Sequence, residues 1–454
     1  MPGTCVITRE IAVADGVFAP GHLGELTQIV PFEMVDAVLA DSGGTQRRLR
    51  KLPARVVACL LLAAALFEQA GYLAVWRKLT GPLESLPIPK ITATALWHAR
   101  TRLGPGPLQA LFDLLRGPAA APGTTGTRWS GMLVCAIDGT CLDVPDSPRC
   151  RARYRKGTNQ YATAGYPQIR LTALVACGTR AVIDAAFGPC TRGETVYGQQ
   201  LMRCLHENMI VLLDRGFASN TFLGAVAGTS ADFLARLSAA RKPPVLRRYQ
   251  DGSFLSQIGQ VKVRIIECEI TIATSAGRQT GIYRLATTLL DPNQHPAFEL
   301  VRLYHEHWEA ESAYFEIKKT MLGRRVLRAR TPAGIAQEVY ALLAAYQIIR
   351  IAIADAIDSA PGADPDRASF TIALETARDQ VIQAANVIAT TVIDLVGTIG
   401  RRVLDNLMPD RRLRLSPRAV KRPLSRYAYK SLKIDRRSYK ATLSIDILTP
   451  PISP

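Results

Sequence analysis

Two aspartates follow short apolar runs of the kind that form buried strands. Asp138 comes directly after residues 132–137, and Asp214 comes directly after residues 209–213. The end of a buried strand is rigid and borders solvent, so a side chain there can face a cleft in a fixed position. Carboxylates in such places suit hard cations such as Mg²⁺. A single aspartate at a strand end is nevertheless more often a turn former or a helix cap.

A third acidic residue, Glu311, lies in a segment with helical periodicity, residues 304–318. If this segment is one α-helix with about 100° between residues, Tyr304, His307, Glu311 and Lys318 share one narrow face with two aromatic side chains. A carboxylate and an ammonium group in an apolar stripe cost free energy unless they are paired or bind a metal or a phosphate. An ion pair within the helix or between domains is the alternative to a functional role.

The same segment resembles the Y-x2-R-x3-E-x6-K signature of the insertion-sequence-four group of DDE transposases, with its four positions occupied by Tyr304, His307, Glu311 and Lys318. Residues 137–140 and 214–217 resemble the blocks that carry the first two carboxylates of that group. The order and spacing of the three blocks agree as well, and the resemblance covers roughly residues 20–350.

The resemblance implies a transposase that cuts DNA at transposon ends and joins them to target DNA by two-metal-ion chemistry. Asp138, Asp214 and Glu311 would be both the catalytic residues and the ligands of Mg²⁺, which Mn²⁺ can replace. Tyr304, His307 and Lys318 would contact DNA, as would Arg215, which follows the second aspartate. The partners would be double-stranded DNA, as transposon inverted-repeat ends and as target, and a second copy of the chain in the DNA complex.

One position departs from the signature, because His307 stands where the group has arginine. A histidine is mostly neutral near pH 7, so its contact with phosphate would be weaker and would act mainly at acidic pH. This departure motivates an alternative, a noncatalytic DNA-binding protein derived from a transposase, although all three carboxylates are present. A metal-dependent nuclease that only hydrolyses DNA is the other alternative, since it would use the same carboxylates.

The elements that must position these residues alternate between strands and helices. Strands are expected at 132–137, 169–177, 181–187, 209–213 and 232–237, with a helix at 194–206, which indicates a mixed α/β sheet. With the resemblance, the fold class is an RNase H-like core. Helices at 31–39, 53–79 and 92–103 precede it, and a Pro- and Gly-containing linker at 117–123 follows them.

A β-rich insertion interrupts the expected core. Residues 261–274 alternate between apolar and polar, slip phase at Ile265 and Ile266 as a bulge would, and turn at 275–277 before a second strand. Pro296 then opens a helical segment that runs to about Leu322, and helices at 335–357 and 369–386 follow. We therefore predict a helical, DNA-end-binding domain at 1–127, the catalytic core at 128–239 and 295–358, the insertion at 240–294, and a helical and basic C-terminal region at 359–454.

The composition favours a nucleic-acid partner. The chain has 454 residues, a formal net charge of +18 and a pI near 9.7, and residues 401–440 hold fourteen Lys and Arg against three Asp. The nine cysteines are scattered and form no CxxC pair, which indicates a reduced setting. The longest apolar run, Val56 to Phe67, is too short to span a bilayer, and no secretion signal is evident. We expect a cytoplasmic, nucleoid-associated protein with no membrane partner.

Overall fold

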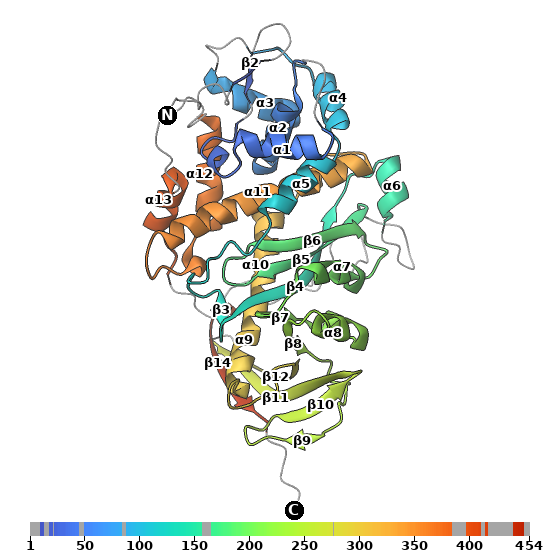
Figure 1. Ribbon diagram of the computed structural model, residues 1–454, viewed down its shortest axis with the longest axis vertical. Helices are drawn as coiled ribbons and strands as arrows, with labels where there is room; N and C mark the ends of the chain where they lie inside the picture. The colour runs from blue at the N-terminus through green and yellow to red at the C-terminus, as the bar shows by residue number, and fades with distance from the viewer. Residues whose placement is uncertain are drawn as a thin grey trace, which may run out of the picture. The chain divides into compact units, whose positions relative to one another are not determined.

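The computed structural model describes residues 10–12, 18–20, 22–44, 50–83, 88–156, 165–275, 277–383, 396–409, 414–415 and 439–448. The chain folds into two compact units, each assembled from distant segments. Unit 1 comprises Met1–Thr125, Leu142–Arg153 and Ala313–Pro409, and unit 2 comprises Gly126–Cys141, Tyr154–Ser312 and Asp410–Pro454. Figure 1 shows the elements of both units, coloured along the chain.

Unit 1 is mainly helical among its described residues. Its N-terminal helices are α1 (Phe32–Asp41), α2 (Ala54–Leu66), α3 (Tyr72–Thr80), α4 (Ala93–Leu103) and α5 (Gly106–Leu115). A short pair of strands, β1 (Glu10–Ala12) and β2 (Phe18–Pro20), precedes them. The helices expected at 31–39 and 92–103 are thus confirmed, but the single helix expected at 53–79 was wrong. It is two helices, because the chain leaves helical geometry at Phe67 and Gly71 caps the start of α3.

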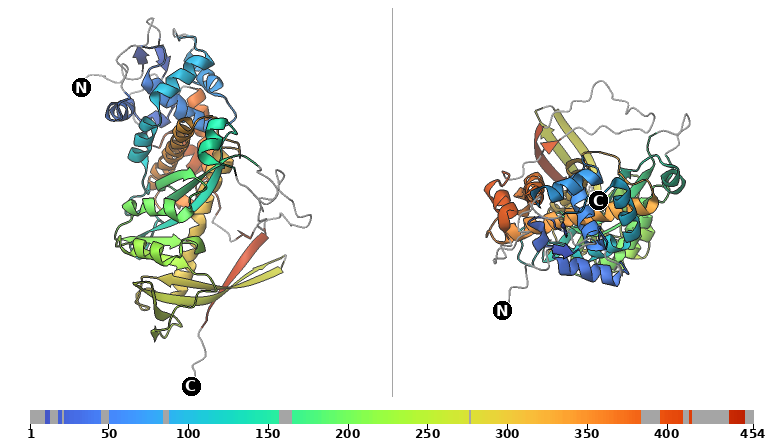
Figure 2. Two further views of the ribbon diagram at one scale, coloured as in Figure 1. Left: turned by 90° about the vertical axis from the view of Figure 1, so that its right-hand side faces the viewer. Right: turned by 90° about the horizontal axis from the view of Figure 1, so that it is seen from above.

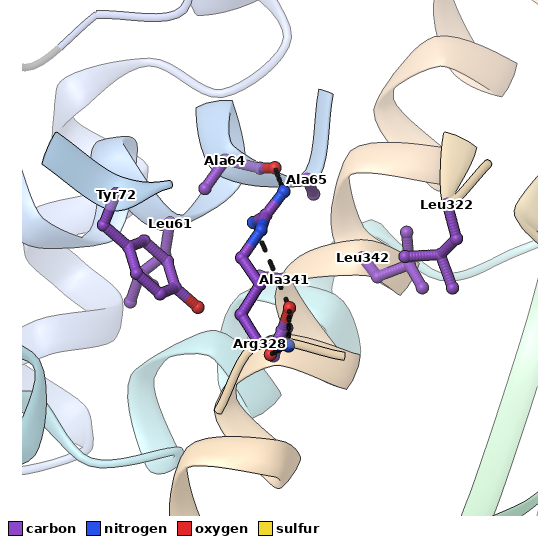
Figure 3. A pocket seen from close by; sticks show the side chains of 9 residues that line it. Leu61, Ala64, Ala65, Tyr72, Leu322, Arg328, Ala341 and Leu342 are labelled. Atoms are coloured by element: carbon purple, nitrogen blue, oxygen red, sulfur yellow. Dashed lines mark hydrogen bonds and ion pairs between the residues drawn. The ribbon is translucent and has the colours of Figure 1, made fainter. Parts of the chain in front are cut away.

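An arginine from a distant segment closes the end of α2. The guanidinium of Arg328 donates to the carbonyls of Ala64 at 2.9 Å and Phe67 at 2.8 Å, which satisfies carbonyls that the helix leaves without partners. Glu338 accepts from the backbone N–H of Arg328 at 2.9 Å, and the guanidinium also lies over the ring of Tyr72 (Figure 3). The positive charge of Arg328 at the C-terminal end of α2 therefore stabilises a helix end that the apolar periodicity of residues 53–79 did not reveal.

The longest helix, α11 (Pro332–Asp358), forms the centre of unit 1 and packs against α2, α5, α12 (Phe370–Ile382) and α13 (Gly397–Asp405). It is long and apolar enough to cross a membrane by those two criteria alone. However, 83% of its most apolar window is buried inside the protein, as in a core helix. Helices were expected at 335–357 and 369–386, and both are present over the described residues; residues 384–386 lie outside them. Most of the basic stretch 401–440 also lies outside the described residues.

Unit 2 is built on a mixed sheet. Its central strands are β4 (Met132–Asp143), β5 (Gln168–Ala176), β6 (Val182–Pro189), β7 (Met209–Leu213) and β8 (Asp232–Arg236), in the spatial order β8-β7-β4-β5-β6. β4, β7 and β8 run parallel, whereas β5 and β6 form an antiparallel pair with a register shift between Leu174 and Val175. The expected mixed α/β class is therefore confirmed.

Helices cover both faces of these strands (Figures 1 and 2). On one face, side chains of α7 (Glu194–Gln200), of the 3₁₀ turn Leu201–Cys204 and of α8 (Asn220–Ala227) pack against alternate strand residues. α9 (Ala297–Tyr304) and its continuation lie on the opposite side. Because both faces are covered, Met132–Ile137 and Met209–Leu213 are buried at every position, which explains their continuous apolar sequences.

The β-rich insertion extends the same sheet. β12 (Gly277–Thr287) pairs with β8, β11 (Val261–Thr274) pairs with β12, and β10 (Phe254–Ile258) and β9 (Arg247–Arg248) follow from β11. The bulge expected at Ile265 and Ile266 was wrong, since the register runs through both residues without a shift. Both side chains are buried because β11 is covered on both faces: Ile265 joins the core beneath α8, and α9 also packs on β11. Two adjacent apolar residues therefore fit an ordinary strand here.

A C-terminal strand that we did not expect completes this edge. β14 (Tyr439–Ile447) pairs antiparallel with β11 over residues 441–447, and β13 (Arg414–Leu415) pairs with β14. The sequence does alternate there, with Leu443, Ile445 and Ile447 separated by polar residues. Its position after a long basic stretch hid a period-two signal that is typical of strands.

A buried histidine ties the start of unit 1 to α3. His22 is only 1% exposed, its Nε2 lies 3.1 Å from the carbonyl of Leu79, and the Gly24 N–H donates to its Nδ1 at 3.2 Å. One ring nitrogen donates while the other accepts, so these contacts require the neutral imidazole. Burial lowers the pKa of His22 to about 4, opposed in part by the bond to Leu79.

We expect His22 to destabilise the fold on acidification. Its folded-state pKa lies below the unfolded value of 6.5, so the unfolded chain takes up a proton first and stability falls as pH drops from 6.5 towards 4. At pH 5 this amounts to about 2 kcal/mol. His22→Gln keeps a donor and an acceptor without a titrating group, so its unfolding free energy should fall less than that of the wild type between pH 7.5 and pH 5. Equal losses in urea unfolding would exclude His22 as the source.

Candidate active site

The pairing of β4 with β7 sets the positions of the two aspartates. The strands run parallel from Leu133↔Met209 to Ile137↔Leu213, and the next residues along each chain are Asp138 and Asp214. The expectation that Asp138 lies beyond its strand was wrong, because β4 continues to Asp143. Only its pairing with β7 ends before Asp138, and this leaves both carboxylates at the same edge of the sheet.

Strand alternation directs both aspartates to one face. Leu133, Cys135 and Ile137 pack into the core beneath α7 and α8, so Asp138, one residue on, projects to the opposite face. The same alternation applies to β7 and Asp214. Asp214 Oδ1 also accepts from the Gly216 N–H at 2.7 Å, as the cap of a short 3₁₀ turn. Arg215, in that turn, is exposed beside it.

Glu311 comes from the helical segment on that opposite face. This segment begins after Pro296 as expected, but it is not one regular helix: α9 leads into a 3₁₀ turn at His305–His307, then α10 (Trp308–Phe315) and a π-helical turn at Glu316–Met321. Glu309 accepts from Arg180 Nε at 2.5 Å, and both side chains are almost fully buried. This ion pair anchors the start of α10 to the turn between β5 and β6.

The change in helical geometry affects the expected common face of the signature residues. Tyr304, His307 and Glu311 belong to unit 2, but Lys318 lies in the π-helical turn and belongs to unit 1, where it is half-buried. A constant 100° per residue therefore does not describe the segment from Tyr304 to Lys318. The assignment of Lys318 to DNA contact stays a prediction.

The pKa of Asp138 shows which other carboxylates influence it. Burial, and to a smaller extent repulsion from Glu194, Glu311 and Asp214, raises the pKa of Asp138 to about 7, against a lowering by the Gly139 N–H. Each of these charges thus lies near enough to Asp138 to disfavour its ionised form. Asp138 therefore interacts electrostatically with Asp214 and Glu311, which are far from it in sequence, while the catalytic role of the three stays a prediction.

Tyr304 and His307 stack beside the carboxylates, with ring centroids 5.8 Å apart. The Tyr304 hydroxyl donates to the carbonyl of Leu213 at 3.2 Å, directly before Asp214. Burial lowers the pKa of His307, while Asp214, Glu311 and a bond to the Ile137 carbonyl oppose this. Its Nε2 is buried and has no hydrogen-bond partner among the described residues. In the DNA-free chain His307 is therefore held largely neutral, with one ring nitrogen able to accept a new partner.

Sequence reasoning missed one acidic residue of this cluster, Glu194. It is the first residue of α7, and it lies 3.6 Å from Arg170 on β5. The available signal was a glutamate at the start of a helix within a sheet whose other strand ends carry aspartates. That signal is weak, because glutamate in a first helical turn is common for electrostatic reasons alone.

The donors of this cluster fit a divalent cation. Asp138, Asp214 and Glu311 offer only carboxylate oxygens, which are the ligands that Mg²⁺ prefers, and they are carried by strand ends and one anchored helix. Their mutual repulsion is the kind of electrostatic cost that a bound cation removes. The three residues that the sequence indicated therefore have the chemistry to hold a metal, and Glu194 repels the first of them.

Comparisons with known proteins match most of the chain. Residues 20–113 match the family Insertion element 4 transposase N-terminal, and residues 129–348 match the family Transposase DDE domain. The chain is 25% identical over 398 residues to Transposase InsG for insertion sequence element IS4 of Escherichia coli (strain K12), covering 86% of this chain and 90% of the relative.

Two further proteins are similar over different extents. Putative transposase InsZ of Escherichia coli (strain K12) is 30% identical over 134 residues, covering 29% of this chain and 45% of the relative. A solved structure of a piggyBac transposase synaptic complex with hairpin DNA aligns with a TM-score of 0.41 and 11% identity, covering 89% of this chain and 87% of that one.

The repulsion at Asp138 predicts a stabilising substitution. The folded-state pKa near 7 lies above the unfolded value of 3.8, so the contribution of Asp138 is lost as pH rises from about 4 to about 7. In EDTA at pH 8, Asp138→Asn should raise the free energy of unfolding by about 2 to 4 kcal/mol, and by less at pH 5. Melting curves at the two pH values test this. An Asn variant that is no more stable than the wild type at pH 8 would show that burial and the neighbouring carboxylates do not destabilise ionised Asp138.

Proposed function

The chain belongs to the insertion-sequence-four group of DDE transposases, and on that premise we propose that Asp138, Asp214 and Glu311 form its catalytic metal site. It is therefore an enzyme of DNA transposition. The observation that carries the site assignment is that each aspartate directly follows the last paired residue of β4 or β7, with Glu311 repelling Asp138. These residues stand in the family's order along the chain.

The finer fold assignment is an RNase H-like core. Three strands, of which β5 and β6 are antiparallel to each other, are followed by α7, β7, α8 and β8, with β4, β7 and β8 parallel. The first two carboxylates follow the central parallel pair. The insertion then extends the sheet from β8 before the chain returns with Glu311. This order of elements supports the assignment, because the first two acids directly follow the central parallel pair.

Mg²⁺ is the proposed cofactor, with Mn²⁺ able to replace it. Held by these carboxylates, the metal would supply the Lewis acidity that activates an attacking oxygen and stabilises the leaving one. The protein's contribution is to hold the carboxylates rigidly. Asp138 and Asp214 are fixed by strand pairing, and Glu311 by the buried Arg180–Glu309 pair in its own helix. Such fixed positions reduce the reorganisation needed during the reaction.

Cleavage and joining are the same exchange at phosphorus with different nucleophiles. In cleavage, water attacks the phosphodiester, a P–O bond forms, and the bond to the 3′ oxygen breaks to leave a 3′-hydroxyl. In strand transfer that hydroxyl attacks a target phosphodiester, so one P–O bond replaces another. Because the number of phosphodiester bonds is conserved in strand transfer, one set of carboxylates serves both steps without an external energy source.

The proposed DNA contacts follow Asp214 in sequence or lie in the helical segment that carries Glu311. Arg215 is exposed next to Asp214, and the buried Nε2 of His307 can accept a hydrogen bond or, once protonated, approach a phosphate oxygen. Tyr304 positions the backbone before Asp214 through its hydroxyl, and Lys318 keeps its expected role as a phosphate contact. The net charge of +18 supports binding to double-stranded DNA. We propose that the enzyme acts as a homodimer on transposon ends and target, in the cytoplasm at the nucleoid.

Glu311→Gln tests the catalytic assignment. The substitution removes a metal-binding charge without removing a cationic phosphate contact, so cleavage of duplex DNA carrying the element's terminal inverted repeats should fall by on the order of 10³-fold or more. DNA binding should remain within about 2-fold of the wild type. Cleavage rates in Mg²⁺ and gel-shift affinities in EDTA provide the two measurements.

Glu375→Gln serves as the matched control. Glu375 lies on a helix of unit 1 in an exposed ion pair with Arg378, and its loss should leave both quantities unchanged. Undiminished cutting by the Glu311 variant would exclude the metal-site role. Cutting by the wild type without any joining would instead support a nuclease that only hydrolyses DNA.

A further inference from the structure

Glu194 reaches the backbone of β4 next to Asp138. A β-carbon added to Gly139 would lie 1.7 Å from Glu194 Oε1 and 2.6 Å from its Cδ, so the carboxylate occupies the place of a side chain at position 139. Since pairing with β7 ends at Ile137, α7 can present Glu194 to β4 beyond that point. Gly139 is thus required for the close approach, which sets a fourth carboxylate against the backbone of the residue that follows Asp138.

The charge on Glu194 is coupled to this cluster more strongly than its sequence position suggests. Among the three carboxylates that repel Asp138, Glu194 has the largest effect. Burial raises the pKa of Glu194 itself, Arg170 lowers it, and repulsion from Asp214 raises it again. Glu194 therefore interacts with both aspartates of the proposed metal site, although it approaches β4 from the face covered by α7.

Two ordinary roles explain Glu194 only in part. A glutamate in a first helical turn is favoured by the helix dipole, and an ion pair with Arg170 adds to this. Glu299 fills both roles elsewhere, in the first turn of α9, with its own partner Arg302 at the same 3.6 Å. Glu299 is 44% exposed, whereas Glu194 is less exposed and lies against other acids. A neutral side chain at position 194 would avoid that repulsion, so the presence of a carboxylate there calls for a further explanation.

We propose that Glu194 is a fourth acidic residue of the metal site and holds a divalent cation beside Asp138, either directly or through a bridging water. This inference rests on the proposed function. Gly139 would then leave the space for the Glu194 carboxylate. Glu194 differs from Asp214 and Glu311 in the element that carries it. It comes from α7, which covers the other face of the sheet.

Mn²⁺ binding to the full-length chain tests this proposal without reference to cleavage. Free Mn²⁺ is measured by electron paramagnetic resonance during titration of the wild type and of Glu194→Gln, Glu299→Gln and Asp138→Asn. We expect Glu194→Gln to weaken binding by about 10-fold or more, as loss of a group that holds a metal or its ligands does. Glu299→Gln, which loses a similar ion pair at a similar helical position, should bind as the wild type does.

The outcomes separate this inference from the function on which it rests. Weak binding by Asp138→Asn with unchanged binding by Glu194→Gln would overturn the role of Glu194 alone. Unchanged binding by both would overturn the metal site itself. Arg170→Gln separates metal binding from the ion pair, because removal of a nearby positive charge should leave Mn²⁺ affinity equal or higher. Equal weakening by Arg170→Gln and Glu194→Gln, with equal loss of melting temperature, would assign Glu194 to a structural ion pair.

Discussion

The parallel pairing of β4 with β7 is the constraint on which the site depends. Its last pair, Ile137 with Leu213, fixes the register, and a shift by one residue would turn Asp138 or Asp214 into the opposite layer. The register is well determined because the paired parts of the two strands, Met132–Ile137 and Met209–Leu213, are buried at every position. The burial of apolar strand residues, which take no part in the chemistry, thereby fixes the positions of Asp138 and Asp214.

Carboxylates that repel one another in a partly buried place cost the fold free energy. The pKa of Asp138 near 7 reflects burial first and three neighbouring carboxylates second. A protein selected only for stability would have a neutral residue there, and the fold accommodates the charge because the surrounding sheet is apolar and extensive. The pairing of Arg180 with Glu309 has the same logic: a buried ion pair that contributes little net stability fixes the orientation of α10.

The sequence was most informative where local pattern and structure coincide. The apolar runs before Asp138 and Asp214 predicted the strands, because a strand that is buried on both faces has apolar residues at successive positions. Glu194 was not identified, because its significance arises from contact with Gly139 across 55 residues of chain, and spacing does not encode such a contact. The helical segment around His307 was located correctly, but its 3₁₀ turn was not, because periodicity averages over local changes in helical geometry. β14 was hidden by the basic stretch that precedes it.

Carboxylates from β4, from the end of β7 and from α10 are proposed to form one cation site. It is tested most directly by a crystal of the full chain soaked in Mn²⁺, with diffraction recorded at the manganese absorption edge. An anomalous peak about 2.1 Å from carboxylate oxygens of both Asp138 and Asp214, with Glu311 facing it, is the expected result. Peaks confined to other acidic groups, with these three side chains bound to none, would contradict the account.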